Sequence, residues 1–239
     1  MIPCRAFFFW DGEEMSWLRK QSIETFRALN PTWEVEILDG KNIPIKGKSR
    51  LARVGRSDWG RYKALLDKGG VYFDSDIMFC RAIPDSWLDY DMVLPLVGDA
   101  DTDPTPEGPI GHVACLGAEA GNKWAAMLDE LCAALAASGE NLQYQALGMM
   151  IVNKCVSALD GYKVCWIIKE TFIPITWSAT DHLWRSGTKR VPLSPLTLGV
   201  HWFGGDWTAM ALEDEIDAAW IMESNCIVAQ AWKMAMGVK

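Results

Sequence analysis

Two aspartates separated by one residue, Asp74 and Asp76, are the side chains of this sequence best placed to do chemistry. They follow Gly69-Gly70 and the short apolar run Val71-Tyr72-Phe73, which predicts that they lie at the end of a strand. Carboxylates at positions i and i+2 can both reach a hard divalent cation, or one can bind the cation while the other accepts hydrogen bonds from sugar or ribose hydroxyls. Such triplets also occur in solvated turns, so the surrounding residues must decide between these interpretations.

The elements that must position this motif begin at the N-terminus. The apolar run at 5–10 predicts a buried strand, and the pair Asp11 and Glu14 predicts a capping box that opens a helix. Asn30-Pro31 ends that helix, and apolar residues alternate with glutamates at 33–37, as in a half-buried strand. Strand, helix and strand in this order indicate an α/β sheet.

The remainder of the chain continues the α/β pattern. A second helix is expected over 57–68, and Gly69-Gly70 is a plausible C-terminal cap for it. Further strands are expected at 113–116 and 164–168, further helices at 122–137, 143–159 and 213–236, and a loop at 98–109. We see no internal repeat and no linker, so one domain over 1–239 is expected.

Composition excludes several classes of protein. The 239 residues have a formal net charge of −8, which argues against a nucleic-acid partner because phosphate binding needs clustered positive charge. Seven cysteines with no C-x-x-C pair favour reduced thiols and a cytoplasmic protein. No apolar run is long enough for a helix that spans a membrane. Any contact with a membrane is therefore expected to be peripheral, at the inner membrane face.

One segment runs against the acidic balance. Between 41 and 63 there are eight basic residues, namely Lys41, Lys46, Lys48, Arg50, Arg53, Arg56, Arg61 and Lys63. The segment is either a solvated charged loop or a surface that holds a diphosphate, an anionic acceptor or a membrane.

The stretch SDWGRYKALLDKGGVYFDSD at 57–76 resembles the SD-x-x-R and GG-x-Y-x-D-x-D signature of retaining glycosyltransferases of family 32, the capsular-polysaccharide and yeast mannosyltransferase type. The glucosylating clostridial toxins share this signature more distantly. FFFWDG at 7–12, SIETFRALNPTWEVEIL at 22–38 and HWFGGDW at 201–207 also resemble the family, in fitting order. The resemblance covers about the first 85 residues well and implies a GT-A fold, an α/β architecture with a single Rossmann-like mixed sheet flanked by helices.

This resemblance implies roles for four residues that would bind the donor. Trp10 would stack on the base, although an indole there can equally fill the core. Asp58 and Arg61 lie one helical turn apart and would hold the hydroxyls of the donor sugar; the alternative is an ion pair on a solvated helix. Tyr72 would point toward the diphosphate or sugar, or would be a core aromatic of its strand.

The resemblance also implies a metal site. Asp76 would bind the cation directly, Asp74 would bridge to ribose, sugar or a metal-bound water, and His201 would be a third ligand. A neutral imidazole suits Mn²⁺ better than Mg²⁺. Trp207 would contact the leaving phosphate through its indole N–H. Asp74, Asp76 and Arg61 would be the catalytic residues.

Two positions depart from the family pattern. Asp206 stands where relatives more often have a small hydroxyl residue, and Leu147-Gly148-Met149 replaces a Thr-Gly-Pro-like turn on the acceptor side.

The expected activity is transfer of a hexose from a UDP- or GDP-sugar to a hydroxyl acceptor such as a glycan, with retention of configuration. A nucleotidyltransferase is the first alternative, but the acidic segment Asp11-Gly12-Glu13-Glu14 would repel a triphosphate. A catalytically inactive domain that binds a nucleotide sugar or glycan is the second. An assay of donor hydrolysis in the presence of Mn²⁺ distinguishes an active transferase from an inactive binding domain.

Overall fold

The computed structural model describes residues 1–12, 14–96, 112–138, 143–185 and 193–238, so the loop expected at 98–109 lies outside the described residues. The chain divides into two compact units. The first comprises Met1–Asp11, Glu34–Asp74 and Asp85–Ile168, and the second comprises Gly12–Trp33, Ser75–Pro84 and Lys169–Lys239. The chain therefore passes from the first unit to the second inside the Asp74-Ser75-Asp76 motif.

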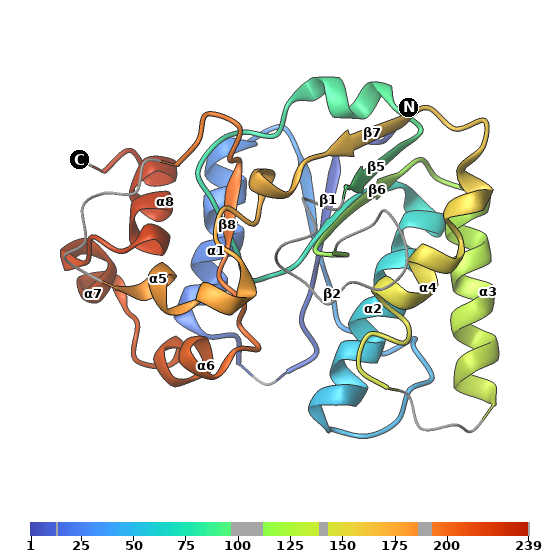
Figure 1. Cartoon of the computed structure of the whole chain (residues 1–239), viewed down its shortest axis with the longest axis horizontal. Helices are drawn as coiled ribbons and strands as arrows, with labels where there is room; N and C mark the ends of the chain where they lie inside the picture. The colour runs from blue at the N-terminus through green and yellow to red at the C-terminus, as the bar shows by residue number, and fades with distance from the viewer. Residues whose placement is uncertain (13, 97–111, 139–142, 186–192, 239) are drawn as a thin grey trace. The chain divides into compact units, whose positions relative to one another are not determined.

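A six-stranded mixed sheet forms the centre of the first unit (Figure 1). Its strands, in spatial order, are β2 (Glu34–Leu38), β1 (Arg5–Phe9), β3 (Gly70–Phe73), β6 (Cys115–Ala118), β5 (Met92–Pro95) and β7 (Val164–Ile167). Only β6 runs antiparallel to its neighbours. The carboxyl ends of the other five strands therefore meet at one edge, which is where Trp10 follows β1 and Asp74 follows β3.

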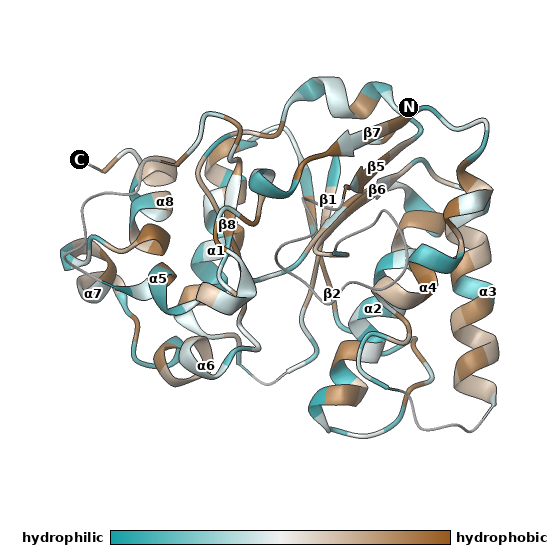
Figure 2. Cartoon of the chain, viewed as in Figure 1, coloured by the Kyte–Doolittle hydropathy of each residue, from teal (hydrophilic) through white to brown (hydrophobic). Residues whose placement is uncertain are grey.

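The described residues of this unit also form the helices α2 (Arg50–Lys68), α3 (Lys123–Ala137) and α4 (Met149–Lys154). Two 3₁₀ turns, η1 (Asp85–Asp89) and η2 (Val156–Leu159), complete it. Helix α2 packs against α3, and both contribute to a core with the sheet that includes the fully buried Phe7, Tyr62, Tyr72 and Trp124. Figure 2 shows the hydrophobic residues along β5 and β7 in brown. This core fixes the strand ends that carry the polar residues.

The second unit is built on a two-stranded antiparallel sheet, β4 (Ile77–Phe79) with β8 (Gly199–His201). Helix α1 (Trp17–Leu29) packs against β4 and against α8 (Ile227–Met236). The remaining elements are α5 (Asp181–Trp184), α6 (Trp207–Glu213), α7 (Ala218–Glu223), η3 (Lys169–Thr171) and η4 (Trp177–Ala179). Buried side chains such as Leu18, Met78, Trp202 and Val228 form a core of its own.

The expected strands are found within two residues of their predicted bounds, but the starts of two helices were wrong. Helix α1 begins at Trp17 because the Ser16 hydroxyl accepts from the Arg19 N–H, whereas Asp11 pairs with Arg56 and does not cap the helix. Helix α2 begins seven residues before the predicted start, at Arg50, because Ser49 caps it. Five of the eight basic residues of the 41–63 segment therefore lie on this helix.

Two long predicted helices are divided in the structure. The 143–159 region contains α4 and η2, separated at Cys155. The 213–236 region includes the end of α6, then α7 and α8, because Asp217 and Cys226 each begin a new helix by accepting hydrogen bonds from backbone N–H groups. Among the described helices, none combines the length and the hydropathy that a bilayer-spanning helix needs.

Candidate functional site

A buried ion pair on α2 is the first part of the candidate site. Asp58 and Arg61 have side chains only 6% and 4% exposed, and Arg61 Nη2 lies 2.8 Å from Asp58 Oδ1. The expected local ion pair thus exists, but it lies in the protein interior and not on a solvated face. Arg61 also donates to the carbonyl oxygen of Val113. Because a charge is rarely buried without a partner, both residues are held in fixed positions.

Arg61 connects this pair to the end of β3. Its guanidinium lies 3.5 Å from Asp74 Oδ1 and 4.4 Å from the centre of the Tyr72 ring. The Tyr72 hydroxyl donates to Asp74 Oδ1 over 2.9 Å and lies 2.9 Å from the Ser57 hydroxyl. The ring of Tyr72 therefore lies in the core, while its hydroxyl reaches the first aspartate of the Asp74-Ser75-Asp76 motif. The structure brings Asp58, Arg61, Tyr72 and Asp74 together as one network.

Burial changes the protonation of this network. Burial raises the pKa of Asp58 to about 6, although Arg61 pulls it downward. Burial likewise raises the pKa of the Tyr72 hydroxyl well above its ordinary value, so that it remains a hydrogen-bond donor to Asp74. Asp58 is consequently the carboxyl of this network that changes charge near neutral pH.

The turn at Gly148 lies against Asp58. A Cβ added at Gly148 would be 2.8 Å from Asp58 Oδ2, which is closer than side chains tolerate. Tyr62 holds the turn through a hydrogen bond from its hydroxyl to the Leu147 carbonyl oxygen, 2.9 Å long. The segment that departs from the family pattern on the acceptor side therefore contacts a residue expected to bind the donor sugar.

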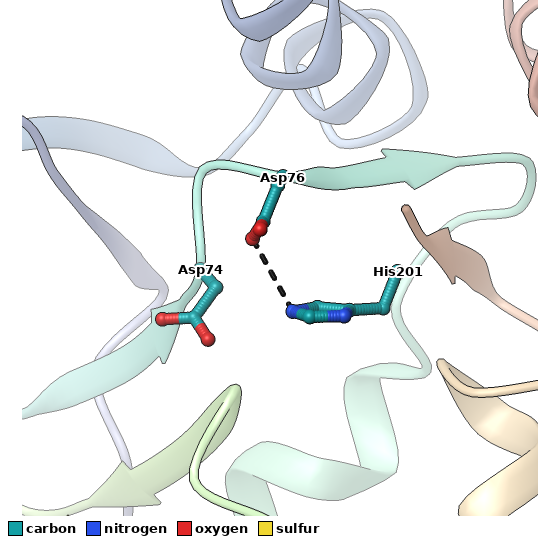
Figure 3. Close-up of side chains that lie close together, drawn as sticks. All are labelled: Asp74, Asp76 and His201. Carbon is teal, nitrogen blue, oxygen red and sulfur yellow. Dashed lines mark ion pairs between the residues drawn. The ribbon is translucent and has the colours of Figure 1, made fainter. Parts of the chain in front are cut away.

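The second unit pairs Asp76 with His201. Asp76 directly precedes β4, His201 ends β8, and the antiparallel register places His201 opposite Ile77. This pairing brings His201 Nε2 to 3.3 Å from Asp76 Oδ1 (Figure 3), with the two side chains 11% and 14% exposed. Residues 125 positions apart in sequence thus meet because the two strands pair.

The turn after β8 completes the surroundings of Asp76. Phe203 has a φ of +52°, which is uncommon for a residue with a side chain, and the Gly204 N–H donates to Asp76 Oδ2 over 2.8 Å. Burial alone would raise the pKa of Asp76, but His201, Arg19 and the Gly204 N–H together hold it below its ordinary value. Asp76 is thus a carboxylate at neutral pH.

The two tryptophans expected to bind the donor lie in different units. Trp10 is half-buried directly after β1, and its backbone N–H donates to the Leu38 carbonyl oxygen over 2.8 Å. Trp207 is the first residue of α6 and is 83% exposed, so its indole is accessible. Asp206 caps α6 by accepting from the Thr208 N–H, which explains an acidic residue at this position.

Sequence reasoning missed several residues around Asp76. Arg19 on α1 donates to the Ser75 hydroxyl over 3.0 Å and pairs with Glu213 at the end of α6. Gly204 had no assigned role, although its N–H binds Asp76. The HWFGGDW segment pointed to this region, but no signal in the sequence linked Arg19 with Glu213.

The donor types suit a divalent cation. Asp74, Asp76 and His201 each offer one ligand atom, and two carboxylate oxygens with one imidazole nitrogen form a set that Mn²⁺ accepts. Asp76 and His201 already converge within one unit, and only Ser75 separates Asp74 from Asp76 along the chain. The residues present therefore fit such an ion.

Comparison with known proteins defines the class. Residues 16–94, that is 79 of 239, match the model of a family described as "Glycosyltransferase sugar-binding region containing DXD motif". The α/β fold is the GT-A fold expected from the sequence, and the second unit contributes a further two-stranded sheet. A third of the chain is therefore similar to the DXD sugar-binding region of glycosyltransferases, and this match supports a transferase.

Solved structures give the particular likenesses. A glycosyltransferase involved in glycosylation of the major capsid of PBCV-1 is 14% identical, with 89% of this chain and 99% of that chain covered and a TM-score of 0.55. PaToxG glycosyltransferase is 16% identical (66% and 72% covered, TM-score 0.46), and the galactosyltransferase LgtC, in complex with donor and acceptor sugar analogues, is 11% identical (98% and 96% covered, TM-score 0.47). No curated protein matches the chain.

Proposed function

We propose that this protein transfers a hexose from a UDP- or GDP-sugar to a hydroxyl of an acceptor, such as a glycan, with retention of configuration, as in family 32. The observation that carries the proposal is the Asp76–His201 pair, 3.3 Å apart, at a DXD motif inside the segment that matches the sugar-binding family. Both units would form one GT-A catalytic domain over residues 1–239.

Asp76, His201 and Asp74 would hold a divalent cation, Mn²⁺ in preference to Mg²⁺ because one donor is an imidazole. When bound, such an ion neutralises charge on the diphosphate of the donor. The Gly204 N–H already keeps Asp76 Oδ2 oriented, and the Tyr72 hydroxyl does the same for Asp74 Oδ1. Both carboxylates are therefore preorganised by donors of this chain.

Asp58 and Arg61 would bind the hydroxyls of the donor sugar. Asp58 Oδ1 is already bound by Arg61, so Oδ2, on the side of Gly148, is the oxygen that would accept a hydrogen bond from the sugar. Trp10 would stack on the base, since an indole face suits a flat heterocycle. The exposed Trp207 would donate its indole N–H to the leaving diphosphate.

Retention would proceed by departure of the diphosphate and attack of the acceptor hydroxyl on the same face of the sugar, with the hydroxyl proton passing to the departing diphosphate. A double displacement requires a carboxylate close to the anomeric carbon on the opposite face, and the sequence identifies none. Arg61, with a fixed positive charge beside Asp74, would stabilise the negative charge that develops on the departing group. A glycosyl adduct on an Asp or Glu, detected by mass spectrometry, would contradict this mechanism.

Isothermal titration calorimetry with UDP, GDP and CMP, each with and without Mn²⁺, tests the proposal. We expect one nucleoside diphosphate to bind in a Mn²⁺-dependent way, and Asp76→Ala to abolish that binding. Asp67→Ala, which changes an exposed carboxylate on α2, is the matched control and should bind like the wild type. Binding without donor hydrolysis would favour the inactive binding domain, and no binding in any condition would refute a nucleotide-sugar site.

The cysteine pattern, seven cysteines with no C-x-x-C pair, supports the further proposal of a cytoplasmic protein. Contact with a membrane would be at most peripheral, and liposome sedimentation would test it.

A further inference from the structure

A second, partly buried ion pair lies in the same unit as Asp76. Arg19 on α1 and Glu213 at the end of α6 have side chains 12% and 13% exposed. Arg19 Nε lies 2.6 Å from Glu213 Oε1, and Nη2 lies 3.3 Å from Oε2, so that the pair is bidentate. The Ser16 hydroxyl donates to the same Oε1 over 2.6 Å. This arrangement joins the start of α1 to the end of α6.

The Arg19 guanidinium also contacts both backbone segments that shape the Asp76 site. Its Nη1 donates to the Ser75 hydroxyl over 3.0 Å, and Ser75 is the buried middle residue of the motif. Its carbon Cζ lies 4.9 Å from the centre of the Trp202 ring, and a Cβ added at Gly204 would overlap Nη2. One side chain therefore supports the residue before Asp76 and the turn that donates to Asp76.

Burial of such a pair needs a reason other than stability. Replacing a buried ion pair by packed apolar side chains is often neutral or stabilising, because desolvation offsets the Coulomb attraction. A guanidinium, however, presents its donors in a rigid planar fork, which fixes the relative positions of the groups it binds. Arg19 uses that fork on Glu213 and Ser75 at once.

We propose that Arg19 is a positioning residue that, through Ser75 and the Gly204 turn, holds Asp76 and His201 in the geometry that binds the cation, while Glu213 orients the fork. The inference rests on the proposed function, because it assumes the cation at Asp76 and His201. The inference adds that affinity for the cation depends on α1 and α6, although neither helix contains a residue that would bind the cation. Glu213 ends the helix that begins at Trp207, so the same pair also anchors that helix.

Two variants of the full chain test the proposal, with Mn²⁺ alone as the titrant in calorimetry. Arg19→Lys keeps the charge but loses the fork, and Ser75→Ala removes only the hydrogen bond from Arg19. We expect each to weaken Mn²⁺ binding by about tenfold, as the loss of one charged hydrogen bond does. Arg27→Lys is the matched control, because Arg27 forms an exposed pair with Glu24 on the same helix.

Thermal unfolding of the same variants separates positioning from stability. Ser75→Ala retains the Arg19–Glu213 pair and loses one hydrogen bond, so we expect weaker Mn²⁺ binding with only a small fall of the unfolding midpoint. If Arg19→Lys or Ser75→Ala lowers the midpoint while Mn²⁺ affinity stays within about twofold, the role of Arg19 is only structural and the inference is overturned. If the wild type binds no Mn²⁺, the proposed cation site itself is refuted, together with this inference.

Discussion

Replacing Asp58 by Asn should make the protein more stable at neutral pH while removing recognition of the donor sugar. Asp58 is buried beside Arg61, and burial raises its pKa to about 6 from an ordinary 3.8. The folded protein therefore pays a free-energy penalty to ionise this carboxyl. An amide has nearly the shape of the protonated acid and retains an oxygen that accepts from Arg61, but it cannot ionise.

The sign follows from proton binding. Between pH 3.8 and 6 the unfolded chain has lost the proton of Asp58 while the folded protein retains it, so the free energy of unfolding falls as pH rises through this range. The two pKa values differ by about 2. Since a difference of one in pKa corresponds to about 1.36 kcal/mol, the difference in free energy of unfolding is about 3 kcal/mol. Asp58→Asn should thus match the wild type near pH 4 and exceed it by about 3 kcal/mol above pH 7.

Urea unfolding at pH 4, 5, 6 and 8 measures this difference directly. Asp67→Asn is the control, because it makes the same substitution at a residue of the same helix that is 54% exposed and lies outside the Asp58–Arg61 pair. Calorimetry should show that Asp58→Asn still binds the nucleoside diphosphate but gains nothing from the attached sugar. A variant less stable than the wild type at pH 8, or a difference that does not change with pH, would refute the reasoning.

Three further substitutions have expected outcomes. His201→Ala should weaken Mn²⁺ binding at least tenfold in calorimetry, and unchanged affinity would remove this residue from the site. Gly148→Ala should reduce affinity for the nucleotide sugar but not for the free nucleoside diphosphate, because its Cβ would be 2.8 Å from Asp58 Oδ2; equal losses for both would contradict this. Gly69→Ala should destabilise the protein by more than 1 kcal/mol in urea unfolding, because Gly69 has a φ of +65° and a Cβ would be 2.5 Å from the Ala120 N atom; an unchanged midpoint would count against it.

Local sequence patterns predicted the elements of the first unit well. The alternation or apolar runs of β1, β2 and β3 depend on burial of neighbouring side chains, and the Gly69 cap depends on a backbone conformation that glycine favours. The starts of α1 and α2 were missed because Ser16 and Ser49 cap them, and neither hydroxyl stands in a strong capping pattern. A single side-chain hydrogen bond therefore decided each boundary.

The residues of the candidate site also differ in how well the sequence predicts them. Asp58, Arg61, Tyr72 and Asp74 lie within 17 consecutive residues. Helical spacing predicted that Asp58 and Arg61 face the same way, and the family resemblance placed all four at the donor. Proximity of His201 to Asp76 needed the family resemblance, because only the antiparallel pairing of β4 with β8 brings them together. That Gly148 contacts Asp58 could not be inferred, since the contact depends on how the turn before α4 packs on α2.

Arg19 and Glu213 show most clearly what the sequence alone could not predict. They are 194 residues apart, and each looks like an ordinary charged residue of an amphipathic helix. In the folded unit their side chains are only 12% and 13% exposed, and charged groups that are largely removed from water need a partner. The pairing of Arg19 with Glu213 thus depends on how this unit packs. The low exposure of the two side chains in the structure identifies them as residues that orient Asp76, and no sequence motif does.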